Sequence, residues 1–215
     1  MRNKLETKIS KIMSLVENLP YFTIDDISAV ESDKTYLKIL FSRYKKSGRI
    51  INLKKGVYVC SSYTDKLKMH GLFSSYIEFV SNILYSSSYI SLDYILYKHN
   101  ILTEIPINFT CISLNKTKVF SNNFGRFFYH KIKDKLFCGF KIIKEGKFAI
   151  YKATKAKALF DYLYLRKNIL KNKESIDELR LNMSAFNKKD LSEFKKYLKI
   201  ENSKKMKEIF NLLIG

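Results

Sequence analysis

Lysine, arginine and hydroxyl side chains gather between residues 34 and 59, in the segment KTYLKILFSRYKKSGRIINLKKGVYV. This segment carries eight cations and no acid, whereas residues 17–33 carry five acids and no cation. Lysine and arginine neutralise phosphates, arginine also binds guanine edges, and serine and threonine hydrogen-bond to DNA backbone or bases. The stretch therefore predicts a nucleic-acid-binding face, with an ordinary solvated basic surface as the alternative.

This local contrast is more informative than the total charge. The chain has 40 cations and 20 acids, a formal net charge of +20, which favours a polyanionic partner such as nucleic acid or an acidic membrane surface. Its abundance of Lys, Ile, Asn, Tyr and Phe is typical of a genome rich in A and T, which raises the lysine content everywhere. Such a bias does not by itself place an acidic block beside a basic one.

The elements that would position these cations can be read from apolar spacing. It predicts helices at about residues 4–18 and 23–30, and a third helix that begins near Asp33 and ends at Gly48. The segments RIINL and GVYVC then predict a short hairpin. This order predicts a winged helix-turn-helix DNA-binding domain over residues 1–62, in which the third helix reads the DNA and the hairpin is the wing.

The buried stripe of the third helix, through Leu37 and Leu40, defines the opposite face as the one that meets DNA. On that face Ile39 is expected either to touch a thymine methyl or to pack against the next domain. At the hairpin tip Lys54 and Lys55 are expected either to meet phosphates or to form a solvated turn. The predicted DNA-binding residues are Lys34, Thr35, Lys38, Ile39, Ser42, Arg43, Lys46, Arg49, Lys54 and Lys55.

The rest of the chain predicts a second, larger domain. The polar segment SSYTDK at residues 61–66 is expected to be the joint between the two domains. Helices are predicted near 67–84 and 91–99, then strands between residues 107 and 151, and then further helices. This order is typical of an α+β fold, with a mixed, mostly antiparallel sheet and flanking helices, including C-terminal ones, over residues 63–215.

Residues that could support catalysis are scattered. An Asp followed by Glu-x-Lys is the metal-binding pattern of many nucleases, and Asp134, Glu145 and Lys147 match it. However, Glu145 and Lys147 fall at a predicted turn, which holds metal ligands poorly. We therefore expect no catalytic residue, no metal site and no cofactor, with a metal-dependent nuclease as an alternative.

Other features of the sequence indicate the cellular compartment and the classes of partner. The histidines His70, His99 and His130 lack a second ligand at metal spacing. Three cysteines lie far apart, which is typical of a reducing cytoplasm. No apolar run is long enough for a transmembrane helix, and the N-terminus lacks the apolar core of a signal peptide. We expect a cytoplasmic protein with no membrane partner.

Three stretches of the second domain share their pattern with a known family. They are SYISLDYILYKHNIL at 88–102, FGRFFYHKIKDKLFCGF at 124–140 and FAIYKATKAKALFDYLYL at 148–165. Together with the N-terminal segment that ends in KKGVYV, they resemble the AbiEi-like antitoxins of type IV toxin–antitoxin systems, which act in abortive infection as a defence against phage. The resemblance covers about residues 5–166. It departs at Lys155-Ala156, where the family often has Pro-Glu.

The resemblance implies an antitoxin that is also a transcriptional repressor of its own operon. Its winged helix would bind inverted repeats in double-stranded promoter DNA. Its second domain would counter a nucleotidyltransferase-type toxin, which in type IV systems generally happens without direct contact between the two proteins. The alternative is a winged-helix transcriptional regulator with a ligand-sensing domain, which a wide apolar pocket among the middle strands would favour.

A candidate antitoxin surface follows within the resembling stretches. It consists of Ser91, Arg126, Lys157 and Asp161, taken as lining one polar surface. The simpler interpretation is that Lys157 and Asp161, one helical turn apart, pair with each other on the helix surface.

Overall fold

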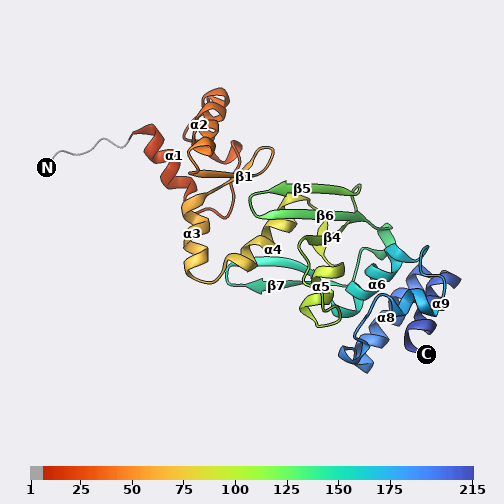
Figure 1. The fold of residues 1–215 in the computed structure, drawn as a ribbon. Helices are drawn as coiled ribbons and strands as arrows, with labels where there is room; N and C mark the ends of the chain where they lie inside the picture. Colours follow the sequence, from red (N-terminus) through yellow and green to blue (C-terminus); the bar gives the residue numbers. More distant parts are fainter. Residues whose placement is uncertain (1–6) are drawn as a thin grey trace. The chain divides into compact units, whose positions relative to one another are not determined.

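The computed structural model describes residues 7–215, so the predicted start of the first helix, before Thr7, lies outside the described residues. The chain divides into two compact units. The first is the chain up to Ile77 together with Ser121–Phe124, and the second is Glu78–Phe120 together with Gly125–Gly215. Figure 1 shows the helices and strands of both units, coloured along the sequence.

The first unit begins with helices and a two-stranded hairpin. Its elements are α1 (Lys8–Val16), the 3-10 turn η1 (Asp25–Ile27), α2 (Lys34–Lys46), β1 (Ile50–Lys54), β2 (Val57–Cys60) and α3 (Ser61–Met69). Strands β1 and β2 pair antiparallel. The Asp33 side chain begins α2 by accepting hydrogen bonds from the backbone N–H groups of Thr35 and Tyr36, at 2.8 and 3.0 Å.

Aromatic rings hold the first unit together around Phe22. The Phe22 ring lies 5.4 Å from that of Phe41 on α2 and 5.8 Å from that of Tyr58 on β2. The backbones of Phe22 and Tyr58 also exchange hydrogen bonds, at 2.8 and 2.9 Å. The hairpin and α2 are therefore fixed to the same core. The predicted helix at residues 23–30 is only the 3-10 turn η1, because Ile27 is the single buried residue of that turn and a longer helix lacks apolar support.

The polar segment 61–66, which was predicted as the joint between the domains, forms the first turns of α3. Although the segment is polar in composition, one side of α3 is buried, through Tyr63, Thr64 and Leu67. The predicted helix at 67–84 is two helices, α3 and α4 (Phe73–Leu84), separated at Gly71, whose φ of +68° is left-handed. The two compact units part between Ile77 and Glu78, within α4.

The second unit is α+β and is built on one mixed sheet. Its strands lie in the order β5-β6-β4-β3-β8-β7. Their bounds are β3 (Ser88–Ile90), β4 (Phe109–Ser113), β5 (Lys118–Asn122), β6 (Gly125–Lys131), β7 (Phe140–Glu145) and β8 (Phe148–Ala153).

The prediction of a mixed sheet is confirmed. Strands β3 and β4, and β7 and β8, pair antiparallel, but β4 pairs parallel with β6 and β3 pairs parallel with β8. After β4 the chain first forms β5 at the sheet edge and returns as β6, which makes β6 parallel to β4. Strand β3, with only three residues, falls in a serine-rich stretch and was not predicted.

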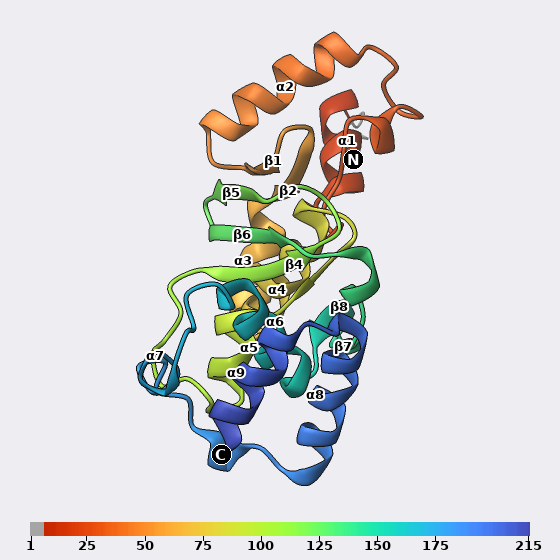
Figure 2. The ribbon, with the colours of Figure 1, turned by 90° about the vertical axis from the view of Figure 1, so that its right-hand side faces the viewer.

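Helices make up much of the rest of the second unit. They are α5 (Leu92–Lys98), α6 (Lys155–Arg166), α7 (Lys173–Asp177), α8 (Lys188–Glu201) and α9 (Lys204–Ile214). Helix α6 contacts α5, α8 and α9, an arrangement that Figure 2 shows from the side. Every α6 residue from Ala156 to Leu163 is buried, so α6 is a central helix and has no solvent face over this span. Within residues 7–215 no helix is long and apolar enough to cross a membrane.

Candidate functional site

One face of α2 is cationic and exposed. Leu37, Leu40 and Phe41 are buried on its other side. The predicted DNA-binding residues are all exposed except Lys54, which is half-buried; the exposed ones are Lys34, Thr35, Lys38, Ile39, Ser42, Arg43, Lys46, Arg49 and Lys55. The structure thus brings together a face of α2 and the hairpin tip in one unit, with no hydrophobic side chain of the core on that face.

The cations of this face differ in their partners. Lys34 pairs with the Asp25 carboxylate at 2.8 Å, and the Arg49 guanidinium lies over the Tyr44 ring, 5.5 Å from its centroid. Within the described chain, Lys38, Arg43 and Lys46 form no ion pair. Their positive charge is therefore not neutralised by a carboxylate of the protein, which is the state that binding to phosphate requires.

The hairpin holds its tip in a fixed geometry. The Asn52 side-chain amide donates hydrogen bonds to the backbone carbonyls of Lys54 and Val57, at 2.7 and 3.3 Å. Gly56 takes the left-handed conformation that the turn needs, with φ of +79°. The exposed Lys55 side chain is consequently presented by an ordered turn. On α2, Ile39 is 51% exposed.

The predicted antitoxin surface is not a surface. Lys157 and Asp161 on α6 form an ion pair in which both side chains are 0% exposed. The second Asp161 carboxylate oxygen accepts hydrogen bonds from the Ser91 hydroxyl at 2.8 Å and from the Tyr89 hydroxyl at 3.0 Å. The structure therefore brings Ser91, Lys157 and Asp161 together, but in the interior. Burial raises the pKa of Asp161, whereas Lys157 and the two hydroxyl groups lower it.

The ammonium group of Lys157 is enclosed by aromatic rings. Its Nζ lies 5.8, 5.0 and 5.3 Å from the ring centroids of Tyr89, Phe160 and Tyr197. Cations attract the faces of such rings, so the rings and the carboxylate together compensate a buried charge. The cluster cross-links β3 and α6.

Arg126 lies apart from this cluster. It is exposed on β6, and its guanidinium lies 5.3 Å from the centroid of the Phe128 ring. The expectation of a single polar surface failed because the i, i+4 spacing of Lys157 and Asp161 shows that they share a helix face, but not whether that face meets water.

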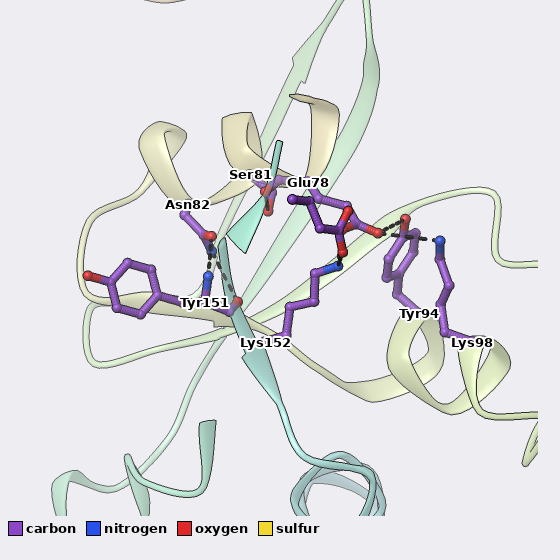
Figure 3. A network of polar contacts seen from close by, with 8 residues as sticks. Glu78, Ser81, Asn82, Tyr94, Lys98, Tyr151 and Lys152 are labelled. Carbon is purple, nitrogen blue, oxygen red and sulfur yellow. Dashed lines mark hydrogen bonds and ion pairs between the residues drawn. The ribbon is translucent and has the colours of Figure 1, made fainter. Parts of the chain in front are cut away.

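A second buried charge cluster, which the sequence analysis missed, centres on Glu78 of α4 (Figure 3). Glu78 is 1% exposed. Its carboxylate accepts a hydrogen bond from the Tyr94 hydroxyl at 2.7 Å and pairs with Lys152, and with Lys98 at 3.5 Å. Burial lowers the pKa of Lys152, but its bonds to Glu145 and Glu78 raise it more, so the net shift is upward. In the sequence, the only sign of this buried charge is a single acidic residue within the apolar run YIEFV.

This cluster also accounts for one residue of the nuclease pattern. The Glu145 carboxylate pairs with Lys152 at 2.5 Å. Asp134 lies on a separate 3-10 turn, Asp134–Leu136. In the part of the chain that the structure describes, no three His, Cys, Asp or Glu side chains are grouped so that they could hold a metal ion.

The second unit contains an open cleft of about 810 Å³. Its floor includes Thr110 of β4 and Phe128 of β6, which are partners in the register of the sheet. The segment 102–108 and the segment 178–180 provide its sides. Hydrogen bonds from Asn182 to the backbone carbonyls of residues 100 and 101, at 3.0 and 2.9 Å, tie these two segments together.

No protein-family model matches the chain, and no curated protein matches it.

Proposed function

We propose that the protein is a DNA-binding transcriptional repressor in which the first unit acts as a winged helix-turn-helix. Helix α2 would lie in the major groove, and the β1–β2 hairpin would be the wing against the phosphate backbone. The observation that carries this proposal is the α2 face on which Lys38, Arg43 and Lys46 are exposed and unpaired by any carboxylate among residues 7–215. Thr35 and Ser42 on the same face would supply hydrogen bonds to bases.

The order of elements supports the same proposal. A helix, a short turn, a second helix and a hairpin follow one another between Lys8 and Cys60. The Asp33 cap and the Phe22 core hold α2 and the hairpin in one rigid unit. A reading helix must be held rigidly to discriminate between bases, because specificity depends on the positions of a few side chains.

We further propose that the protein is the antitoxin of a type IV toxin–antitoxin operon and counters a nucleotidyltransferase-type toxin. Support comes from the three resembling stretches, which meet in the fold: Ser91 in the first hydrogen-bonds to Asp161 in the third, and the second supplies β6. These motif residues form the frame of the second unit. The groups that counter the toxin would therefore be other, exposed side chains.

Two measurements test this proposal together. The full chain should bind its own promoter DNA in a gel-shift assay and should rescue cells that express the nucleotidyltransferase-like gene of the same operon. If promoter and random DNA of equal length bind with equal affinity, the repressor function is wrong. If cells expressing the toxin die equally with and without the chain, the antitoxin function is wrong.

A second candidate function, a winged-helix regulator with a ligand-sensing body, is favoured by the 810 Å³ cleft. Small-molecule sites are generally clefts of about 300–1,000 Å³ lined by apolar side chains and a few polar groups. The cleft lies on the face of strands β4 and β6. It is lined by polar as well as apolar side chains.

A further inference from the structure

The sides of the cleft carry two exceptionally exposed aliphatic side chains. Ile105 is 75% exposed and Ile107 is 92% exposed, and Pro106 lies between them. Most exposed aliphatic residues of the chain keep at least half of their surface covered. Apolar surface of this extent gains free energy when a ligand covers it. The aromatic ring of Phe128 on the floor is a further apolar surface, and it is only half-buried.

The charges of the cleft differ in sign from those of the chain as a whole. Glu104 and Glu178 line it, one from each side segment, and neither forms an ion pair within residues 7–215. A third carboxylate, Asp93, is bonded to Arg166 at 3.4 Å. Among the residues that line the cleft, Arg180 is the one lysine or arginine. Two unpaired carboxylates thus accompany one guanidinium, in a chain where cations outnumber acids two to one.

We propose that this cleft binds an organic cation with an apolar body. Its positive head would lie between Glu104 and Glu178, and its body would cover Ile105, Ile107 and the Phe128 ring. An anion of the same shape would meet two carboxylates against one guanidinium, and it would be rejected. A neutral ligand would gain the apolar contacts alone.

The inference deepens the second candidate function and rests on it only for an effect of the ligand on DNA binding. Binding to the cleft itself does not require the first unit to contact DNA. The proposed ligand site and the proposed ligand-sensing function can therefore be refuted separately. Nothing in the inference depends on the buried Lys157–Asp161 pair or on the Glu78 cluster.

A matched set of three probes tests the ligand class. The uniformly ¹⁵N-labelled full chain is titrated with 4-phenylbutylamine, 4-phenylbutanol and 4-phenylbutanoate, which share one apolar body and differ in charge. The amine should shift the backbone amide signals of residues 102–105, 107–108 and 178–180 and should bind at least about fivefold more tightly than the other two. Equal affinity for the three probes, or amine shifts confined to other residues, would overturn the proposal.

Carboxylate variants test the assigned residues. Glu104→Gln and Glu178→Gln should each weaken binding of the amine about two- to fivefold, the range of exposed ion pairs, and should leave binding of the alcohol unchanged. Glu208→Gln, which removes an exposed carboxylate on α9, is the matched control and should have no effect. If the double variant Glu104→Gln/Glu178→Gln binds the amine as the wild type does, the assignment is wrong.

A DNA measurement separates this inference from the function it deepens. Fluorescence anisotropy gives the affinity of the full chain for promoter DNA with and without saturating amine. Amine binding in the cleft without any change in DNA affinity refutes the ligand-sensing function and leaves the site intact. Normal DNA binding by a chain that fails to bind the amine refutes the site alone.

Discussion

At the scale of single residues, the most informative feature is that several charged side chains are buried, among them Lys157 and Asp161, which were predicted to lie at the surface. Lys157 and Asp161 are completely enclosed, and Glu78 is nearly so. Removing a charge from water costs several kcal/mol, and only good geometry with further hydrogen bonds offsets this cost. Ser91 and Tyr89 provide these bonds for Asp161, and Tyr94 and Lys152 provide them for Glu78. In both clusters, these hydrogen bonds and ion pairs therefore offset the free-energy cost of burying the charges.

Breaking the α6 pair should be costly because one uncompensated charge would stay buried. Asp161→Leu, which leaves Lys157 without its carboxylate, should lower the free energy of unfolding by about 3–5 kcal/mol in urea titrations. The double variant Lys157→Met/Asp161→Leu should recover much of this loss because it buries no charge. A cost for Asp161→Leu below about 1 kcal/mol would show that the pair is not buried.

The His130 imidazole makes stability depend on pH. Burial and the nearby Arg166 lower the pKa of His130 from its usual value of 6.5, while Asp93 opposes the shift. The unfolded chain then takes up this proton more readily than the folded chain, so the free energy of unfolding should decrease as the pH falls below 6.5. His130→Gln should show a smaller decrease between pH 7 and 5 than the wild type. Parallel stability curves for the two proteins would contradict the assignment.

At the scale of elements, local signals predicted most helices and strands. The Asp33 cap, Gly48 and the Lys-Lys-Gly turn predicted α2 and the hairpin to within about two residues. Predictions failed where contacts between distant parts of the chain determine the local structure. The polar segment 61–66 is helical because Tyr63 and Thr64 turn inward, and composition alone does not reveal such a buried side.

The hairpin prediction concerns charge only. Lys54→Ala/Lys55→Ala should weaken binding to promoter and random DNA alike, because phosphates are the same in both. Each lost phosphate contact should lower the slope of log affinity against log salt by about 0.9. An unchanged slope and affinity, measured by anisotropy at several salt concentrations, would show that the hairpin does not touch DNA.

The α2 prediction concerns sequence preference. Thr35→Ala and Ser42→Ala should each reduce the preference for promoter over random DNA, at a cost of about 1–3 kcal/mol for each lost base contact. The comparison needs both DNAs at one salt concentration. Equal losses on the two would mean that these side chains contact only the backbone.

At the scale of the whole molecule, the two compact units predict two separable functions. The triple variant Lys38→Ala/Arg43→Ala/Lys46→Ala alters only exposed side chains of the first unit. It should lose promoter repression in a reporter assay and still rescue cells from the toxin, because the second unit is unchanged. Loss of rescue with normal expression and stability would contradict the division of labour.

Much of the architecture, but less of the site, could be predicted from the sequence. The α+β class and the exposed cationic face follow from periodicity, because a helix with one apolar stripe must turn its other side outward. The interior of the second unit could not be predicted in this way. Helix α6 is buried all round, so its Lys157 and Asp161 carry no periodic signal. The sheet order and the cleft depend on segments far apart in the chain, which local patterns do not specify.

The salt dependence of promoter binding by the full chain tests the central claim most directly. If the unpaired cations of α2 contact phosphates, Lys38→Ala/Arg43→Ala/Lys46→Ala should lower the slope of log affinity against log salt by roughly 2.7, about 0.9 for each contact. The matched control Lys11→Ala/Lys66→Ala/Lys68→Ala removes the same charge from exposed positions on α1 and α3, and it should leave the slope unchanged. Equal slopes for the two triple variants would contradict the account.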